Sequence, residues 1–445
     1  MKKRLNVIFA VLFIIIFSRE ILGETKLNNS VIVENTVWSG DIIVLGPATV
    51  ERNVVLTISP GTVVKFITPD GELNVKGTLQ ANGTHDKKIT FTSYFDSASL
   101  DKWEGIKFSG ETKENSPNKL SHCVIKYAVK GIECFEAATV NIENCTFTKN
   151  NVAVTYLQDS NGVIAQNEFI ENTNGGIICE QAKLKINSNY FINNTDFAIM
   201  CVKKGEVDIE ENFISKSQNG LIFSLAGTVG HVRNNIIQEN EYGVFTEKRV
   251  TLDIDNNTLR ENGYGIYILQ GSYTKITGNE ITGNRIGIFI AEDFDVGINE
   301  NNIYNNKEIA ISLKGVSKEF RNKLKRDFIK DSNISSIPPC MREEFKKENK
   351  ENKENKENKE NEEIDSYGYI DAKRNYWGEE TIKEMEIKGI SANINKIIDY
   401  YDNPELIIDN INYKANYVLY SDWKDSPITG AGAKTGVTYG VVEKK

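Results

Sequence analysis

Residues 235–256 read NIIQENEYGVFTEKRVTLDIDN, and residues 257–278 read NTLRENGYGIYILQGSYTKITG. The two stretches share asparagines at the first and sixth positions and a glycine at the ninth. The first asparagine belongs to a series that recurs every 22 or 23 residues: Cys123, Cys145, Asn167, Asn189, Asn212, Asn235, Asn257, Asn279 and Asn301. A second series follows five residues later: Ala128, Asn150, Asn172, Asn194, Ser217, Asn240, Asn262, Asn284 and Asn306. A repeat of this length predicts a solenoid, because each unit must bury its apolar face against its neighbours.

The residues between the asparagines predict strands. An apolar position lies between the two series in every unit, from Ile125 to Ile303, and a glycine or alanine follows the second series. Apolar and polar residues alternate over short stretches, which is the periodicity of β-structure. Asparagine tolerates the left-handed backbone of a sharp corner, and its amide both donates and accepts hydrogen bonds. We therefore expect asparagine ladders at the corners of stacked coils, and we do not expect these residues to be ligands.

This pattern resembles the right-handed parallel β-helix repeat family, which includes pectate-lyase-like enzymes and periplasmic proteins of the copper-maturation type. The resemblance covers residues 120–315, and right-handed crossovers are also the general preference for parallel strands. Residues 54–108 look like opening coils, residues 370–378 like a last coil, and residues 398–423 like a closing tail. The resemblance implies an all-β, single-stranded right-handed parallel β-helix solenoid of about 12–13 coils.

The N-terminus predicts export. Lys2, Lys3 and Arg4 precede an apolar run from Leu5 to Phe17, which is typical of a signal peptide cleaved near Gly23. The run is too short to span a bilayer, and no later segment is apolar for long enough. We expect a periplasmic, cell-surface or secreted protein without a transmembrane segment after signal removal. The formal net charge of −9 argues against nucleic acid as a partner.

An insertion divides the repeat region from the last coil. Asn301 and Asn375 lie 74 residues apart where 22 would suffice, and the excess contains a Lys-Glu-Asn run without apolar residues. Such a run cannot pack and predicts a solvated spacer. The apolar residues of 316–330 recur every four positions, and this also allows a lid or docking helix. The sequence thus predicts five segments: 1–23 signal peptide, 24–119 N-terminal coils and cap, 120–315 regular repeats, 316–366 insertion, and 367–445 last coil and closing tail.

The strand after each glycine predicts an apolar stripe on the outside of the solenoid. The outward positions are Glu133, Thr155, Ile178, Met200, Ile222, Phe245, Tyr267 and Phe289. Phe245, Tyr267 and Phe289 fall on successive coils, so their rings are expected to stack. Exposed apolar stripes often mark binding surfaces. These three residues are candidate ligand-binding residues for sugar rings or a partner surface, and the alternative is a packing ladder covered by the insertion or the tail.

A second predicted stripe is charged. One line reads Lys185, Asp208, His231, Asp253 and Lys275, and a neighbouring line reads Glu210, Arg233 and Asp255. The simplest interpretation is a ladder of ion pairs on neighbouring strands. Asp208, His231, Arg233 and Asp253 are also the weak catalytic candidates, since such a cluster can perform acid–base chemistry on a polysaccharide. Carboxylates on adjacent coils allow calcium as a further possibility.

Cysteine and histidine usage does not indicate a metal site. The six cysteines include no Cys-x-x-Cys pair, and stacked cysteines fit disulfide geometry poorly, so we expect free core thiols. The three histidines are isolated, and there are four methionines, which leaves the copper role of one branch of the family without ligands.

Three functions remain open on the sequence. The first is a non-catalytic binding or display scaffold for carbohydrate or a cell-surface component. The second is a structural surface or assembly component. The third is a polysaccharide lyase or hydrolase, which requires an acid, a base and often calcium on one face. The fold cannot decide among them, because function resides in sites placed on folds.

Overall fold

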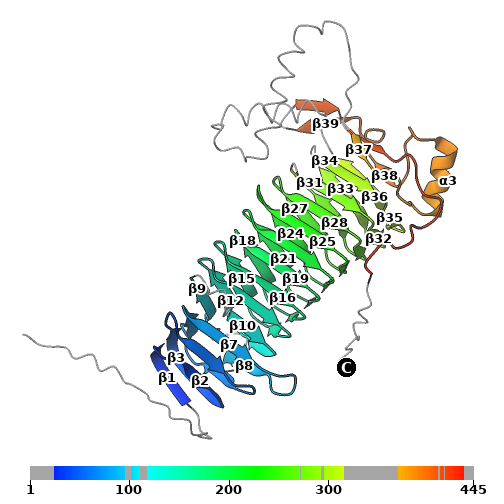
Figure 1. The fold of residues 1–445 in the computed structure, drawn as a ribbon. Helices are drawn as coiled ribbons and strands as arrows, with labels where there is room; N and C mark the ends of the chain where they lie inside the picture. The colour runs from blue at the N-terminus through cyan, green and yellow to red at the C-terminus, as the bar shows by residue number, and fades with distance from the viewer. Residues whose placement is uncertain are drawn as a thin grey trace, which may run out of the picture.

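The chain forms a straight solenoid of parallel strands (Figure 1). The computed structural model describes residues 25–95, 102–110, 118–270, 272–291, 295–314, 369–408, 411–414 and 416–434. The expected signal peptide, 1–23, and the expected insertion, 316–366, lie outside these residues. The parallel solenoid confirms the predicted all-β fold class.

Each coil contributes one strand to each of three stacks. The 14-stranded sheet consists of β2 (Thr36–Trp38), β4 (Val55–Ile58), β7 (Thr78–Asn82), β10 (Asn118–Ser121), β13 (Val140–Glu143), β16 (Asn161–Ala165), β19 (Lys183–Asn187), β22 (Glu206–Glu210), β25 (Val229–Arg233), β28 (Thr251–Asp255), β31 (Tyr273–Thr277), β34 (Asp295–Asn299), β37 (Tyr369–Asp371) and β41 (Tyr417–Leu419). With one strand per coil, the 14 strands of this sheet are close to the expected 12–13 coils.

The other two stacks join in a 25-stranded sheet, in which β1 (Thr25–Ile32) and β3 (Asp41–Val50) take part at the N-terminal end. The short-strand stack consists of β5 (Val63–Phe66), β8 (Ile89–Ser93), β11 (Cys123–Lys126), β14 (Thr146–Thr148), β17 (Glu168–Ile170), β20 (Tyr190–Ile192), β23 (Phe213–Ser215), β26 (Ile236–Gln238), β29 (Thr258–Arg260), β32 (Glu280–Thr282) and β35 (Asn302–Tyr304). The long-strand stack consists of β6 (Glu72–Val75), β9 (Gly105–Ser109), β12 (Lys130–Phe135), β15 (Val152–Leu157), β18 (Gly175–Glu180), β21 (Phe197–Val202), β24 (Asn219–Ser224), β27 (Tyr242–Glu247), β30 (Tyr264–Ile268), β33 (Ile286–Ala291), β36 (Ile309–Lys314) and β38 (Ile397–Ile398).

The apolar positions of the repeat fill the interior in register. Phe147 pairs with Phe169 and Phe169 with Phe191 on successive short strands, and their rings stack with centroids 5.0 and 4.6 Å apart. All three side chains are fully buried. Burial of each such side chain stabilises the fold by about 1.5–3 kcal/mol. The core is therefore a continuous column, and each coil depends on its neighbours.

The asparagine series form the predicted ladders, but the expected left-handed backbone at these asparagines was wrong. The positive φ angle belongs to the residue immediately before each ladder position, for example Asn234 at 54°, Asn256 at 55° and Glu261 at 57°. The ladder asparagines themselves are buried. The preceding residue makes the corner, and the asparagine amide turns inward to saturate the backbone groups that the corner leaves unpaired.

One rung of the first ladder illustrates the bonding. Asn257 Oδ1 accepts from the backbone N–H of Asn235 at 2.9 Å and from Asn235 Nδ2 at 2.9 Å. Asn257 Nδ2 donates to Val232 O at 2.8 Å and to Asn279 Oδ1 at 3.0 Å. The ladder reaches Asn375, whose Oδ1 accepts from both the backbone N–H and Nδ2 of Asn301. The predicted last coil is thus stacked directly on the regular repeats.

The two ends of the solenoid differ. At the C-terminal end, α3 (Glu379–Lys388) lies beside the last coils (Figure 1). Its Ile382 and Met385 side chains are buried in the core. The hairpin β39 (Glu405–Ile408) and β40 (Ile411–Lys414) follows β38. At the N-terminal end, β1 pairs with β3, and Val31 and Val37 are exposed. Among the residues that the structure describes, no helix combines the length and apolar character that crossing a membrane requires.

The cysteines are core residues. The five that the structure describes are free and buried: Cys123, Cys134, Cys145, Cys179 and Cys201. Cys179 and Cys201 share an inward register position, as expected. Burial raises the pKa of the Cys134 thiol, so this group stays protonated at neutral pH. The buried thiols pack as small apolar side chains.

Candidate functional site

An aromatic cluster lies on the outer surface of the long-strand stack. It consists of Tyr242 and Phe245 on β27, Tyr264 and Tyr267 on β30, and Phe289 on β33; we call these five residues the aromatic face. The strand register places Phe245 beside Tyr267 and Tyr267 beside Phe289, as the sequence predicted. Phe289 is 9% exposed, and the other four side chains are half-buried. The aromatic face is therefore a packed surface with outward edges.

The rings form two adjoining columns. Phe245, Tyr267 and Phe289 stack with centroid distances of 5.6 and 4.5 Å and interplanar angles of 12°. Tyr242 and Tyr264 form the second column at 5.2 Å and 7°. Rings of the two columns meet edge to face, for example Tyr264 and Tyr267 at 5.0 Å and 88°. Both arrangements are favourable for aromatic quadrupoles, so the columns hold each other in place.

This geometry limits what the aromatic face can bind. The two faces of the Tyr267 ring are covered by Phe245 and Phe289. A sugar ring stacks on an open aromatic face, whereas this column directs ring edges outward. Burial raises the pKa of Tyr242 and of Tyr267, so both hydroxyl groups remain protonated at neutral pH. The aromatic face thus offers apolar edges and tyrosine hydroxyl groups.

Two cations border the aromatic face. The Arg285 guanidinium carbon lies 4.6 Å from the centroid of the Tyr264 ring, and Lys314 Nζ lies 5.9 Å from that of Phe289. Arg285 also lies 3.6 Å from Glu241 and 3.7 Å from Glu308. An arginine held over a tyrosine by carboxylates is oriented before any partner arrives, which lowers the entropy cost of binding.

Sequence reasoning found one column and missed the other. Simple alternation from Phe245 points Gly243 outward, but both Gly243 and Val244 are buried, and the outward position falls on Tyr242. The break has a steric cause: a Cβ atom on Gly243 would lie 2.5 Å from the Gly265 carbonyl oxygen of the next coil. The recurring Tyr-Gly pair at 242–243 and 264–265 was the available signal.

The charged stripe lies on the outer surface of the 14-stranded sheet. The register aligns Lys185, Asp208, His231, Asp253 and Lys275 on successive strands, and it aligns Glu210, Arg233 and Asp255 beside them. His231 Nδ1 lies 3.3 Å from Asp253 Oδ2, and both side chains are 42% exposed. The four catalytic candidates are therefore close together, but on an open strand surface.

Among the carboxyl groups of this stripe, a shifted pKa is found for Asp255. Burial raises the pKa of Asp255, with a further contribution from Asp253, whereas Lys275 and Arg233 oppose the shift. Among the residues that the structure describes, no group of three His, Cys, Asp or Glu side chains is placed to hold a metal ion. The arrangement is that of cross-strand charge pairs.

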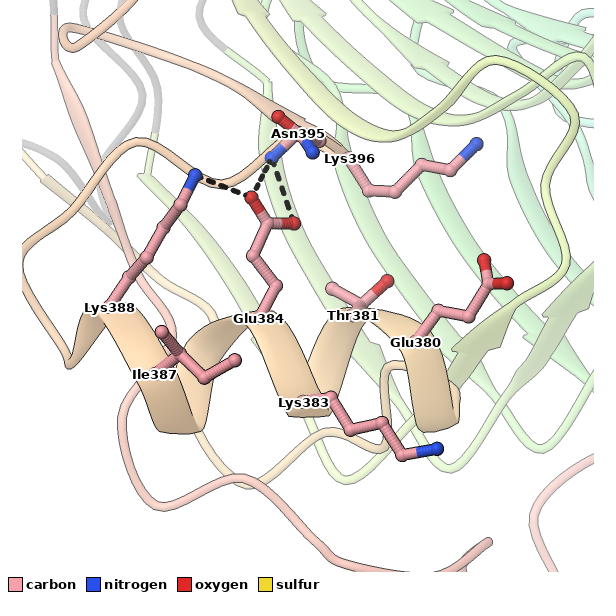
Figure 2. Close-up of a pocket in the computed structure, with 8 residues that line it drawn as sticks. All are labelled: Glu380, Thr381, Lys383, Glu384, Ile387, Lys388, Asn395 and Lys396. Atoms are coloured by element: carbon pink, nitrogen blue, oxygen red, sulfur yellow. Dashed lines mark hydrogen bonds and ion pairs between the residues drawn. The ribbon is translucent and has the colours of Figure 1, made fainter.

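A third candidate is a hollow of about 440 Å³ beside α3 (Figure 2). Several of its polar groups are bonded within the chain: Glu384 accepts from Lys388 Nζ at 2.7 Å and from the backbone N–H of Asn395. Lys396 Nζ donates to the carbonyl groups of Lys307 at 3.1 Å and Glu308 at 3.0 Å. These bonds fasten α3 and the following loop to the last coils, which is a structural task.

Family comparisons agree with the architecture. The family described as periplasmic copper-binding protein (NosD) matches residues 85–247, and the right-handed β-helix region matches residues 198–333. This chain is a right-handed parallel β-helix repeat protein. No curated protein sequence matches it significantly.

Solved structures are similar at low identity. The periplasmic alginate epimerase AlgG is 14% identical over 60% of this chain, with a TM-score of 0.38, and the chain spans 66% of that protein. A hyperthermoactive exopolygalacturonase from Thermotoga maritima is 14% identical, with 66% of this chain and 82% of that protein covered and a TM-score of 0.36. These likenesses concern the β-helix fold.

Proposed function

We propose that this β-helix protein is an exported, non-catalytic scaffold that binds a component of the cell surface through the aromatic face. The observation that carries the proposal is the pair of interlocked ring columns, with Arg285 held over Tyr264. Tyrosine and arginine dominate the binding energy of protein interfaces, and rigid aromatic groups lose little entropy on binding.

The residues around the cluster extend this surface. Ile178, Met200 and Ile222 precede Phe245 in the same register line, and all three are half-buried. An apolar strip of this kind with a charged border is typical of a protein-binding surface. The edge-outward rings favour a protein component over a carbohydrate that stacks on ring faces. A carbohydrate partner remains the alternative outcome of the test.

The charged stripe supports a non-catalytic role. Among the catalytic candidates, His231 and Asp253 lie within 3.3 Å of each other on the open surface of a sheet, and both side chains are 42% exposed. An acid–base pair acts most effectively where water is excluded. In the described part of the chain, no three His, Cys, Asp or Glu side chains are grouped so that they could hold a metal ion. We therefore assign no copper site.

The test uses the purified chain and envelope fractions from the source cells. We expect retention on untreated envelopes, unchanged retention after periodate oxidation of sugars, and loss after protease treatment. Tyr267→Ala is expected to weaken retention at least about tenfold, because it removes the ring between two stacked partners. Tyr273→Ala is the matched control, since Tyr273 is an exposed tyrosine on the 14-stranded sheet.

Other outcomes would contradict the proposal. Loss of retention after periodate but not after protease would make the partner a carbohydrate. Cleavage of a polysaccharide that disappears with Asp253→Ala or His231→Ala would make the charged stripe an active site. Equal retention of the Tyr267→Ala and Tyr273→Ala variants would remove the aromatic face from the binding surface.

A further inference from the structure

The closing tail runs along the outer surface of the short-strand stack. The amide of Asn302 on β35 binds the tail twice: its Oδ1 accepts from the backbone N–H of Ile428 at 2.8 Å, and its Nδ2 donates to Ile428 O at 3.2 Å. The backbone N–H of Gly432 donates to Gly278 O at 2.8 Å, and that of Ala433 donates to Thr258 Oγ1 at 3.1 Å. The tail therefore descends from coil to coil toward the N-terminal end.

The contacts follow a single register line. Asn302, Glu280 and Thr258 are outward neighbours on β35, β32 and β29. Gly432 is buried over this line, where an added Cβ atom would lie 3.0 Å from Thr258 Oγ1 and 3.1 Å from Glu280 Cβ. Its φ of +95° is one that glycine adopts readily. The tail backbone is thus held closely against this surface.

The same line becomes apolar one coil beyond Thr258. Its next members are Ile236 on β26, Phe213 on β23 and Tyr190 on β20. The rings of Tyr190 and Phe213 stack at 4.8 Å, and all three side chains are half-buried. Ile192 and Ile170 lie outward on the neighbouring line. We call Ile236, Phe213 and Tyr190 the apolar track.

We propose that the apolar track is a docking site for the chain's own residues 435–445, which follow the described closing tail in the sequence. The described tail ends at Lys434, one coil from Ile236. Coils are about 4.8 Å apart and an extended residue advances about 3.3 Å, so about five residues reach Tyr190. Residues 435–439 read TGVTY, and Val437 and Tyr439 supply the apolar side chains that this track fits.

Docking of this segment would give two stacks of the solenoid different roles. The short-strand stack would carry the tail, whereas the aromatic face lies on the long-strand stack and stays available to a partner. The inference does not depend on the proposed function, because it concerns a different stack and a segment of the same chain.

The test is disulfide formation in the full chain. Phe213→Cys is combined with Val437→Cys, because the coil and residue spacings bring Val437 level with Phe213. Both are placed in a Cys340→Ser background because the five described native cysteines are buried. The control pair combines Thr146→Cys, an outward residue on the same line three coils from Phe213, with Val437→Cys. We expect the first pair to oxidise at least about tenfold faster, because docking raises the effective concentration of the two thiols.

A second measurement, trypsin cleavage, needs no introduced cysteine and so tests the docking independently of the cysteine substitutions. Trypsin cleavage after Lys434 is expected to be slow in the native chain and several times faster in a Phe213→Asp, Ile236→Asp variant. These side chains point outward, so the core is unchanged. Equal oxidation of the two cysteine pairs together with equal cleavage of the native chain and the variant would overturn the proposal.

Discussion

The two asparagine ladders run side by side along the same solenoid, yet one is continuous and the other is broken. The first ladder passes from Asn167 to Asn301 and continues to Asn375 across the 74 residues that separate the last two rungs. The second is interrupted at Ser217, whose Oγ is buried without a hydrogen-bond partner. At this break Asn194 Nδ2 donates to Phe169 O, and no asparagine amide follows it. The comparison teaches that neighbouring coils tolerate a missing rung because the apolar column and the strand ladders persist.

The largest expected effect is removal of a rung from the continuous ladder. Asn257→Ala leaves the backbone N–H of Asn235 and the carbonyl of Val232 without their partners. Each buried unsatisfied group costs about 1–3 kcal/mol, so a loss of about 3 kcal/mol is expected. The measurement is the midpoint of urea unfolding.

The same substitution at the break is expected to cost less. Asn194 takes part in fewer ladder bonds, since it accepts from Asn172 but has no asparagine below it. Asn194→Ala should cost about 1–2 kcal/mol in the same unfolding experiment. A cost equal to that of Asn257→Ala would show that the two ladders are energetically equivalent despite the break.

Repair of the second ladder is the complementary change. Ser217→Asn would place an Oδ1 acceptor beneath Asn194 and a donor above Asn240, whose Oδ1 already accepts from the Ser217 backbone. A gain of about 1 kcal/mol is expected. Ser217→Ala is the control and should leave stability nearly unchanged, because it removes a hydroxyl group that has no partner. Destabilisation by Ser217→Asn would mean that this coil is too narrow for the longer side chain.

A smaller gain is expected where the first ladder begins. Cys145 Sγ occupies the asparagine position and accepts from the backbone N–H of Cys123 at 3.4 Å, while donating to Glu143 O at 3.3 Å. The thiol therefore copies the amide with weaker bonds. Cys145→Asn should add about 0.5 kcal/mol. Thermal unfolding of Cys145→Asn beside Cys145→Ala would measure this difference.

The smallest effect concerns pH. The ladders are uncharged, whereas the closing turn contains Asp399, which accepts from the backbone N–H groups of Val418 and Tyr401. Burial raises the pKa of Asp399, and the two backbone bonds oppose the shift. A carboxyl group with a raised folded-state pKa binds protons more tightly when folded, so its contribution is present at low pH and is lost as pH rises through that pKa. The amide introduced by Asp399→Asn would keep only one of the two acceptor oxygens, so the variant starts with a fixed loss at every pH. The stability deficit of Asp399→Asn relative to the native chain, measured from unfolding midpoints, should therefore be smaller at pH 7 than at pH 4.

Some features of the molecule could be predicted from the sequence and others could not, and the reason is physical. The repeat, the stacked asparagines, the inward apolar column and the register of Phe245, Tyr267 and Phe289 all followed from periodicity, because a solenoid brings equivalent positions together. The second ring column did not follow, since the alternation breaks where Gly243 approaches Gly265. Ring orientation also did not follow, and it changed the interpretation of the aromatic face from a surface for sugar stacking to one of ring edges.

The sequence by itself determined the repeat length, the parallel coils and the side chains that share each line, because these depend only on spacing along the chain. The tertiary structure decided two features that residue spacing does not determine: the backbone conformation at the corners and the path of the closing tail. The corner conformation belongs to the residue before each asparagine, because the asparagine itself directs its amide inward to bond the neighbouring coils. The closing tail lies over Asn302 and Thr258 and not over the aromatic face as far as it is described, because only folding brings residues 126 and 175 positions apart within hydrogen-bonding distance.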